Sequence, residues 1–282
     1  MNADPSSDSC SRTIALLTDF GLSDCFAGQM KGVIRRIAPR ATMIDLTHLV
    51  PPQSIMLGAV YLQNCIPFFP AETIFVAIVD PGVGTDRRAL IAHAGDHYFV
   101  GPDNGLLSFA MNATAQVHEI ENPAYLLPEI SATFHGRDVF APAAAHLSLG
   151  VPLEEFGRRV GEIIRLQWPK PQPCSDAEWK VPIIGVDNFG NIITGLRAET
   201  LRHLNVRDLM FEVNGLHIGI ISSTFGSVMA GQWLAYWGSD GLLEIAINSG
   251  NAAAECGLGA GDFIQMKDLA RAPEARKGGT RA

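Results

Sequence analysis

The chain has 282 residues, of which 47% are hydrophobic, and a formal net charge of −8. This apolar content excludes disorder for most of the chain, and the length allows one large or two ordinary domains. The acidic balance disfavours nucleic acid as a partner. No apolar run approaches the roughly 20 residues that span a bilayer, and residues 1–11 lack the basic and apolar regions of a signal peptide. We therefore expect a cytoplasmic protein without a membrane partner.

The five cysteines are scattered along the chain, and no Cys-x-x-Cys pair occurs. Structural zinc sites usually contain such close pairs, and the disulfide frameworks of small secreted domains usually have an even number of cysteines at regular spacings. We therefore expect no metal site of this kind.

The first half of the sequence alternates between apolar runs typical of buried strands and segments with helical spacing. We expect strands at residues 13–18, 42–46, 74–79, 89–93 and 98–100, and helices at residues 25–38, 54–65 and 139–149. Such alternation favours a mainly parallel sheet with helices on both faces. The sequence therefore predicts an α/β N-terminal domain over residues 12–168.

The composition changes near residue 168, where three prolines occur within residues 168–173. This density is typical of an extended linker, which we place at residues 169–178. Beyond it, short apolar runs alternate with Asn, Gly and Asp at the spacing of an antiparallel barrel or sandwich. We therefore predict an all-β, barrel-like C-terminal domain over residues 179–268. Residues 269–282 are polar and are expected to form a flexible tail.

Acidic residues follow two of the expected strands, namely Asp19 after 13–18 and Asp80 after 74–79. Ligands of open α/β sheets gather outside the carboxyl ends of the strands, although a single acid there is often only a loop residue or helix cap. His135 lies in a third polar segment, and a lone histidine is usually a satisfied loop residue. The residues alone thus indicate an acid-rich site for a small molecule and leave the substrate open.

Eight motifs together resemble one family in order and spacing, over residues 14–266. They are TDFG at 18–21, GQMKG at 28–32, DLTH at 45–48, DPGVGT at 80–85, GPDNGLL at 101–107, FHGRD at 134–138, DNFGN at 187–191 and SDGLLEIA at 239–246. The chain is similar to the S-adenosyl-L-methionine hydroxide adenosyltransferases, relatives of the fluorinase and chlorinase enzymes. This resemblance implies an α/β domain followed by a β-barrel. It also implies a homotrimer in which each active site lies between the N-domain of one subunit and the C-domain of the next.

The reaction that the resemblance implies is attack of water, as hydroxide or nearly so, on the ribose C5′ of S-adenosyl-L-methionine. The products are L-methionine and adenosine, and S-adenosyl-L-methionine is a substrate, so no cofactor is implied. The resemblance assigns three residues to the attacking water. Asp80 would orient the set, Arg87 would hold and polarise the water, and His135 would hydrogen-bond it.

The substrate contacts also follow from the resemblance. Asp19 corresponds to the carboxylate that binds the two ribose hydroxyls, since a carboxylate can accept from both members of a vicinal diol. The other implied contacts are Asp24 and Asp187 near the methionine end, Ser239 at the methionine carboxylate, Asn191, Asn251 and Ala252 at the adenine, Phe189 stacking nearby, and Glu244. For Glu244, a solvated strand glutamate is an equal alternative.

Three alternative functions deserve comparison with hydrolysis. A halide-transferring enzyme is disfavoured because the Asp80 carboxylate would repel a halide ion at close range. A non-catalytic adenosine or S-adenosyl-L-methionine sensor would need Asp19, Asn191 and Ser239 but not the water-activating set. A metal-dependent hydrolase could use Asp19, Asp24 and Asp80, but no His-rich ligand cluster accompanies these acids.

Overall fold

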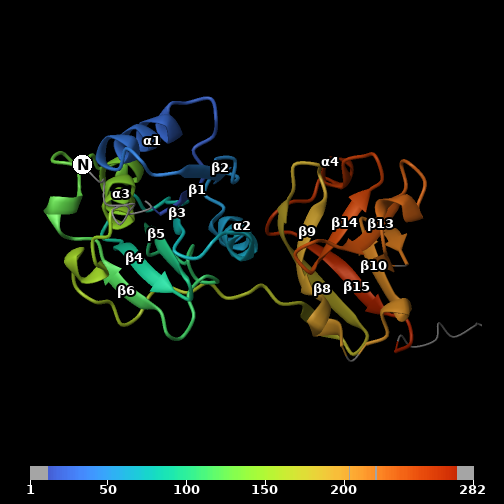
Figure 1. The fold of residues 1–282 in the computed structure, drawn as a ribbon. Coiled ribbons are helices and arrows are strands. Elements are labelled where there is room, and N and C mark those ends of the chain that lie inside the picture. Colours follow the sequence, from blue (N-terminus) through green and yellow to red (C-terminus); the bar gives the residue numbers. More distant parts are fainter. Residues whose placement is uncertain (1–11, 203, 220, 272–282) are drawn as a thin grey trace, which may run out of the picture. The chain divides into compact units, whose positions relative to one another are not determined.

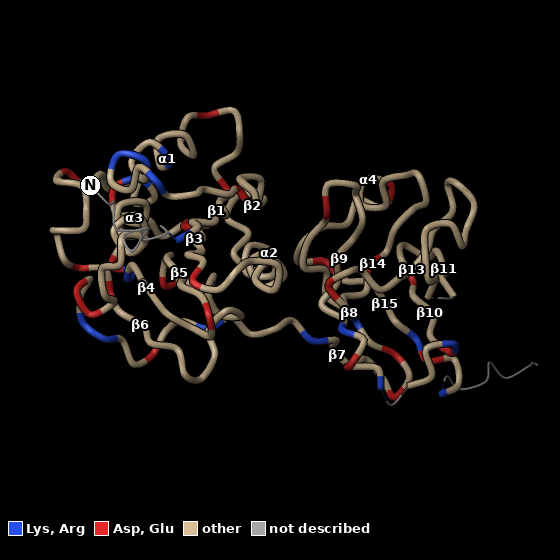
Figure 2. The backbone as a smooth tube through the Cα atoms, viewed as in Figure 1, with Lys and Arg blue, Asp and Glu red and all other residues tan. Residues whose placement is uncertain are grey.

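The computed structural model describes residues 12–202, 204–219 and 221–271 (Figure 1). The chain divides into two compact units, with the boundary between Leu166 and Gln167. From residue 272 onward, the tail expected at 269–282 lies outside the described residues. Among the helices that the structure describes, none is both long enough and apolar enough to cross a bilayer. Acidic and basic residues are interspersed along both units (Figure 2).

The first unit is built on a six-stranded sheet with the order β2-β1-β3-β5-β4-β6. The strands are β1 (Ile14–Thr18), β2 (Met43–Thr47), β3 (Ile74–Ile78), β4 (Ala89–Ala94), β5 (His97–Pro102) and β6 (Gln116–Glu119). The pairs β1–β2, β1–β3 and β3–β5 are parallel, whereas β4 is antiparallel to both β5 and β6. The expectation of a mainly parallel sheet is therefore not confirmed, because the sheet is mixed.

The mixed character comes from the connection between β4 and β5. Only Gly95 and Asp96 separate these strands, and Gly95 has a positive φ of 60°. A two-residue turn reverses the chain direction, so it forces an antiparallel pair, whereas a parallel pair needs a long crossover. The Gly-Asp pair between two apolar runs was a signal in the sequence for this hairpin.

Helices cover both faces of this sheet, as the alternation of strands and helices predicted. The helices are α1 (Phe26–Ile37), α2 (Ile55–Cys65) and α3 (Ala141–Ser148), the last continuing from a π-helical turn at Gly136–Phe140. Successive residues of a strand point to opposite faces. Accordingly, Ile14 and Leu16 of β1 join the core formed with α1 and α3, and Ala15 and Leu17 join the core formed with α2.

The second unit is a β-rich sheet with the order β11-β10-β15-β8-β9-β14-β13-β12, in which β7 pairs with β8. Its strands are β7 (Gln172–Ser175), β8 (Glu178–Val186), β9 (Ile192–Arg197), β10 (Leu209–Val213), β11 (Leu216–Ile218), β12 (Ile221–Ser222), β13 (Trp233–Trp237), β14 (Leu242–Ile247) and β15 (Phe263–Asp268). Strand β11 at one end contacts β13 near the other, so the sheet curls into a half-barrel around one apolar core. A short helix, α4 (Ala252–Cys256), follows β14. The barrel-like prediction is confirmed in this coarse form, and β7 lies within the segment expected to be a linker.

Candidate active site

Each unit contains part of the predicted site. Asp19, Asp24, Asp80, Arg87 and His135 belong to the first unit. The predicted contacts in the second unit are Asp187, Phe189, Asn191, Ser239, Glu244, Asn251 and Ala252.

The three predicted water-activating residues form one connected cluster. Arg87 Nε donates to both oxygens of Asp80, at 2.9 Å and 3.0 Å, and a terminal nitrogen of Arg87 lies 2.5 Å from Asp80 Oδ2. The same terminal nitrogen lies 2.8 Å from His135 Nδ1. The side chains of Arg87 and Asp80 are only 9% and 6% exposed. Burying both partners of an ion pair costs desolvation free energy, which their attraction offsets only when the geometry is good. The three contacts between Arg87 and Asp80 meet that condition.

Local backbone geometry brings Arg87 and His135 together across 48 positions of sequence. Asp80 directly follows the last apolar residue after β3, and Arg87 lies in the loop that leads to β4. Gly84 in this loop has a φ of 77°, and a Cβ there would lie 2.2 Å from the carbonyl oxygen of Ala132. Only glycine tolerates both conditions, so the loop can lie directly against the segment that leads to His135.

The hydrogen bond between Arg87 and His135 fixes how the imidazole is protonated. A guanidinium has no acceptor, so Nδ1 of His135 must accept and its ring proton must reside on Nε2. Burial, followed by the nearby Arg87 charge, lowers the pKa of His135 below 6.5, whereas Asp80 and Asp138 act in the opposite direction. The ring is therefore neutral at pH 7 and can donate from Nε2.

Asp19 lies in the same cavity as part of this cluster. The cavity measures about 370 Å³ and is lined by Asp19, Phe20, Pro52, Gln53, Ile78, Asp80, Pro81, Val83, Thr133, Phe134, His135 and Gly136. One oxygen of Asp19, Oδ2, accepts from the backbone N–H of Gln53 at 2.9 Å. This bond holds one oxygen of the carboxylate, which lines the same cavity as His135 and keeps acceptor capacity for a ligand. Asp24 is exposed in the turn before α1 and, among the described residues, is not part of this lining.

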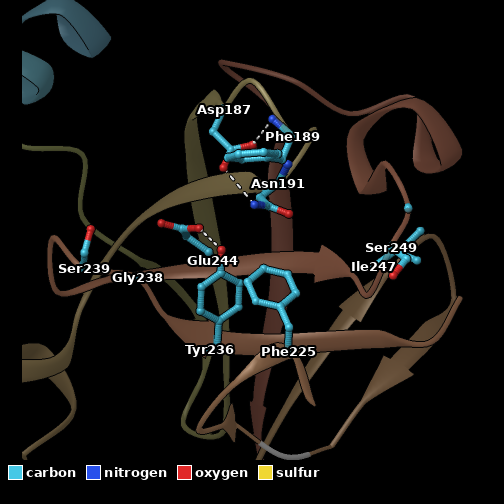
Figure 3. A pocket seen from close by; sticks show the side chains of 11 residues that line it. Asp187, Phe189, Asn191, Phe225, Tyr236, Gly238, Ser239, Glu244, Ile247 and Ser249 are labelled. Atoms are coloured by element: carbon cyan, nitrogen blue, oxygen red, sulfur yellow. Dashed lines mark hydrogen bonds between the residues drawn. The ribbon is translucent and has the colours of Figure 1, made fainter. Parts of the chain in front are cut away.

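The second unit has its own pocket of about 590 Å³ (Figure 3). It is lined by Asp187, Phe189, Asn191, Phe225, Tyr236, Gly238, Ser239, Glu244, Ile247, Ser249 and Gly250. Three aromatic rings therefore surround one amide and two carboxylates, which suits a flat heteroaromatic ligand with polar edges. Phe189 is 74% exposed, so much of its ring surface remains available for stacking.

Asp187 holds the turn that presents Asn191. Its Oδ1 accepts from the backbone N–H groups of Phe189 and Asn191, both at 2.8 Å, and its Oδ2 accepts from Asn191 Nδ2 at 2.7 Å. Because the amide nitrogen of the buried Asn191 is thereby occupied, the arrangement orients its side-chain oxygen (Figure 3). Asp187 therefore positions Asn191, the residue predicted to contact the adenine. A contact of Asp187 itself with the methionine end of the substrate stays a prediction.

Glu244 and Tyr236 face one another on neighbouring strands, where they are direct cross-strand partners. The Tyr236 hydroxyl donates to Glu244 Oε2, and the Tyr236 ring lies 4.8 Å from that of Phe225. Burial and then the nearby Asp187 and Asp240 charges raise the pKa of Glu244, although its bond to Tyr236 acts in the opposite direction. Glu244 is therefore a pocket residue and not a fully solvated strand glutamate. The sequence reasoning missed Phe225 and Tyr236, since nothing in the sequence reveals this strand register.

The remaining predicted contacts occupy different places. Ser239 lines the pocket and its hydroxyl lies 3.2 Å from Asp240 Oδ1. Asn251 caps α4 by accepting from the backbone N–H of Ala254 at 2.8 Å, and Ala252 is buried at the start of that helix. Neither Asn251 nor Ala252 is among the described lining residues, but Gly250 beside them is. Among the residues described by the structure, no group of three or more His, Cys, Asp or Glu side chains is arranged to hold a metal ion.

Together, the fold and the two clusters define an enzyme with an α/β unit and a curled β unit. The first unit contains a buried Asp–Arg–His set beside a carboxylate, and the second contains an aromatic pocket with an oriented amide. Family models for the N-terminal and C-terminal domains of the SAM hydroxide adenosyltransferases match residues 14–157 and 181–265. The chain belongs to this family, as its eight motifs predicted.

Individual relatives agree with this assignment. A curated protein from Salinispora arenicola, named (R)-S-adenosyl-L-methionine hydrolase, is 42% identical and covers 90% of this chain and 97% of its own length. A fluorinase from Nocardia brasiliensis is 29% identical, with 90% of this chain and 96% of its own length covered. The crystal structure of an uncharacterized conserved protein from Thermotoga maritima has a TM-score of 0.81 at 37% identity, covering 90% of this chain and 99% of that one.

Proposed function

We propose that this chain hydrolyses S-adenosyl-L-methionine to adenosine and L-methionine. The observation that carries the proposal is one cavity lined by Asp19, Asp80 and His135, in which the latter two are joined by the buried Arg87. The hydrolase relative from Salinispora arenicola, similar along nearly its whole length, supports the same reaction.

The protonation of the cluster indicates how the nucleophile is stabilised. Neutral His135 lines the cavity and can donate from Nε2 to a bound oxygen. Arg87, a permanent cation, binds Nδ1 of the same ring, and this donor and the nearby positive charge together favour hydroxide over water. The proton of the water passes to solvent, and the oxygen then attacks C5′. The C5′–O bond forms as the C5′–S bond breaks, and the sulfur leaves with that electron pair as neutral methionine, so no acid is needed.

Asp19 would bind the ribose hydroxyls and thereby set the distance between C5′ and the cluster. Proximity of this kind contributes to rate only when the reacting atoms are aligned. In the second unit, Asn191 and the aromatic rings would hold the adenine, and Ser239 would contact the methionine carboxylate. The acids Asp187 and Glu244 would then lie near the positive charge of the substrate.

Halide transfer is the competing function, since fluorinases are among the relatives. A halide would have to share Arg87 with the Asp80 carboxylate, which already takes up three of its contacts. The repulsion between the two anions disfavours this arrangement in a buried site.

The deciding experiment is incubation of the pure protein with S-adenosyl-L-methionine, with and without chloride or fluoride, followed by chromatography. Hydrolysis predicts adenosine in equimolar amount with methionine and no change with halide. Formation of 5′-halo-adenosine would replace hydrolysis with halide transfer. Tight binding of S-adenosyl-L-methionine without any turnover would indicate a sensor.

We also propose that the protein is a homotrimer in which the first unit of one subunit and the second unit of another complete each site. The support is that each unit contains only part of the predicted contacts. Co-expression of Arg87→Met and Asn191→Ala chains tests this arrangement. Assayed at substrate concentrations well below KM, equal random mixing should restore about a quarter of wild-type activity in the whole preparation, because about a third of the sites in each mixed trimer have both halves intact. Mixed trimers no more active than either variant alone would contradict sharing of sites between subunits.

A further inference from the structure

The motif at residues 45–48 has no role in the proposed reaction, although it contains a buried histidine. His48 is 3% exposed and directly follows β2, beside the end of β1. Its Nδ1 lies 2.8 Å from the hydroxyl of Thr18, and its Nε2 lies 3.2 Å from Asp45 Oδ1. At the surface, Lys31 Nζ lies 2.6 Å from the other oxygen of Asp45. The result is a row of polar groups from α1 to the end of β1.

The direction of the hydrogen bonds in this row follows from the chemistry of its members. Nε2 of His48 is buried without a hydrogen-bond partner among the described residues, but the Asp45 carboxylate lies 3.2 Å away and its negative charge favours the His48 proton on Nε2. Nδ1 then accepts, and the Thr18 hydroxyl must donate to it. The Thr18 oxygen in turn accepts the backbone N–H of Phe20 at 3.2 Å. Thr18 and Phe20 are the two chain neighbours of Asp19. The row therefore ends at the backbone segment that carries Asp19, the residue predicted to bind the ribose.

The backbone of His48 reinforces this connection. Its carbonyl accepts from the N–H of Gly21 at 2.7 Å, and Val50 N–H donates to the Thr18 carbonyl at 3.3 Å. Together with the bond from Gln53 to Asp19, these contacts join residues 18–21 to residues 48–53. Of these contacts, the Thr18–His48 bond is the one that joins two side chains and is buried.

We propose that His48, through Thr18, is a positioning residue that fixes the orientation of the Asp19 carboxylate towards the ribose diol. This inference rests on the proposed function of Asp19. Binding two hydroxyls at once requires a carboxylate plane held within about half an ångström, and such accuracy depends on supporting hydrogen bonds. The outer pair of Lys31 and Asp45 is largely solvated and contributes little.

The test uses variants that remove or keep one partner of the hydrogen bond between Thr18 and His48. His48→Leu removes the Nδ1 acceptor, whereas His48→Asn places an amide oxygen at the same distance along the side chain. Thr18→Val removes the hydroxyl and Thr18→Ser keeps it. His118→Leu is the matched control, since His118 is also buried in the first unit and hydrogen-bonded, through Nδ1 to the Gly157 carbonyl at 2.9 Å.

The measurements are the Kd of adenosine by calorimetry, kcat and KM for S-adenosyl-L-methionine, and melting curves. We expect His48→Leu and Thr18→Val each to raise Kd and KM about tenfold, the factor that one lost hydrogen bond typically produces. We expect kcat to change less than about threefold, and His48→Asn and Thr18→Ser to stay near wild type. His118→Leu should lower the melting temperature and leave Kd unchanged.

A second set of variants, made in the Asp19→Asn protein, separates an effect on positioning from an effect on stability. In Asp19→Asn protein, where the carboxylate is already lost, His48→Leu should add less than about twofold to Kd. The same tenfold effect in both backgrounds would overturn the proposal, and so would wild-type Kd in folded His48→Leu protein. If that variant does not fold, the comparison of Thr18→Val with Thr18→Ser decides in the same way. Hydrolysis by the wild-type protein, measured separately, reports on the proposed function itself.

Discussion

The two units differ in how they use charge. In the first unit, Asp80 and Arg87 form a buried ion pair of opposite charge, and burial, followed by the arginine charge, lowers the pKa of His135. In the second unit, acids of like charge lie near one another, and burial, followed by these charges, raises the pKa of Glu244. A paired cluster is electrostatically satisfied before the substrate arrives, whereas a group of acids is stabilised by a cationic ligand. The first arrangement suits catalysis, and the second suits recognition of a positively charged substrate.

The units also differ in the elements that carry their functional residues. The first cavity is made by loops at strand ends, held in place by side-chain bonds across long stretches of sequence. The second pocket includes residues on the face of a sheet, such as Tyr236 and Glu244, set by cross-strand register. If this division is correct, changes in the first cluster should lower kcat, and changes in the second pocket should mainly alter KM.

The largest effect is expected in the water-activating set. Arg87→Met, Asp80→Ala and His135→Ala should each lower kcat about 10²-fold or more, because the groups stabilise charge that develops on the attacking oxygen. Asp80→Ala combined with His135→Ala should cost much less than the product of the two, since the residues act as one unit. Single-turnover adenosine formation beside melting curves measures this. Wild-type rates in folded His135→Ala and Arg87→Met protein would contradict this difference between the two units.

Asp19 should give the next largest effect, although it belongs to the first unit. Asp19→Ala removes a charge-assisted contact to the diol, which typically contributes about 1.5–3 kcal/mol, so binding of S-adenosyl-L-methionine and of adenosine should weaken roughly tenfold or more. Calorimetry with both ligands checks the prediction. Unchanged adenosine affinity in the folded variant would remove the ribose role.

The pH dependence of the reaction should report on His135. Its lowered pKa means that the ring stays neutral as pH falls through 6.5, and protonates only at lower pH. Protonation would remove the Nδ1 acceptor that Arg87 uses, so kcat/KM should fall by about tenfold per pH unit below that lowered pKa. A pH–rate profile measures the inflection, and His135→Gln is the control that should lack it. An acid inflection above pH 6.5 would contradict the electrostatic account of the cluster.

The smallest effect is expected for Tyr236→Phe in the second unit. The ring contact with Phe225 remains, and only the hydrogen bond to Glu244 is lost, so KM should rise severalfold, as for one ordinary hydrogen bond of about 0.5–1.5 kcal/mol. The variant kcat should stay within about threefold of wild type. Glu244→Gln keeps an acceptor for the hydroxyl but removes a negative charge from the pocket, so comparing its KM with that of Tyr236→Phe separates the charge from the hydrogen bond. A large fall in kcat with unchanged KM would show that the second pocket also takes part in the chemistry.

Several features of the site were accessible from the sequence because they depend on short stretches of chain. The acids Asp19 and Asp80 follow apolar runs, and both runs are strands in the structure. His135, by contrast, could not be distinguished from a loop histidine by its neighbours alone. Its significance came from the family motif, and its contact with Arg87 is visible only in three dimensions.

The sequence by itself determined most of the strands and helices, although not, for example, β6, β7 or α4, together with the change from an α/β to a β-rich half and the family. These depend on local hydrophobic periodicity and on motifs whose spacing is preserved along the chain. Only the tertiary structure decided the order of the strands in the first sheet, that Tyr236 faces Glu244, and that His48 joins the segment carrying Asp19. Those features arise from strand pairing and close approach between distant segments. Their free energy comes from contacts that local sequence does not encode.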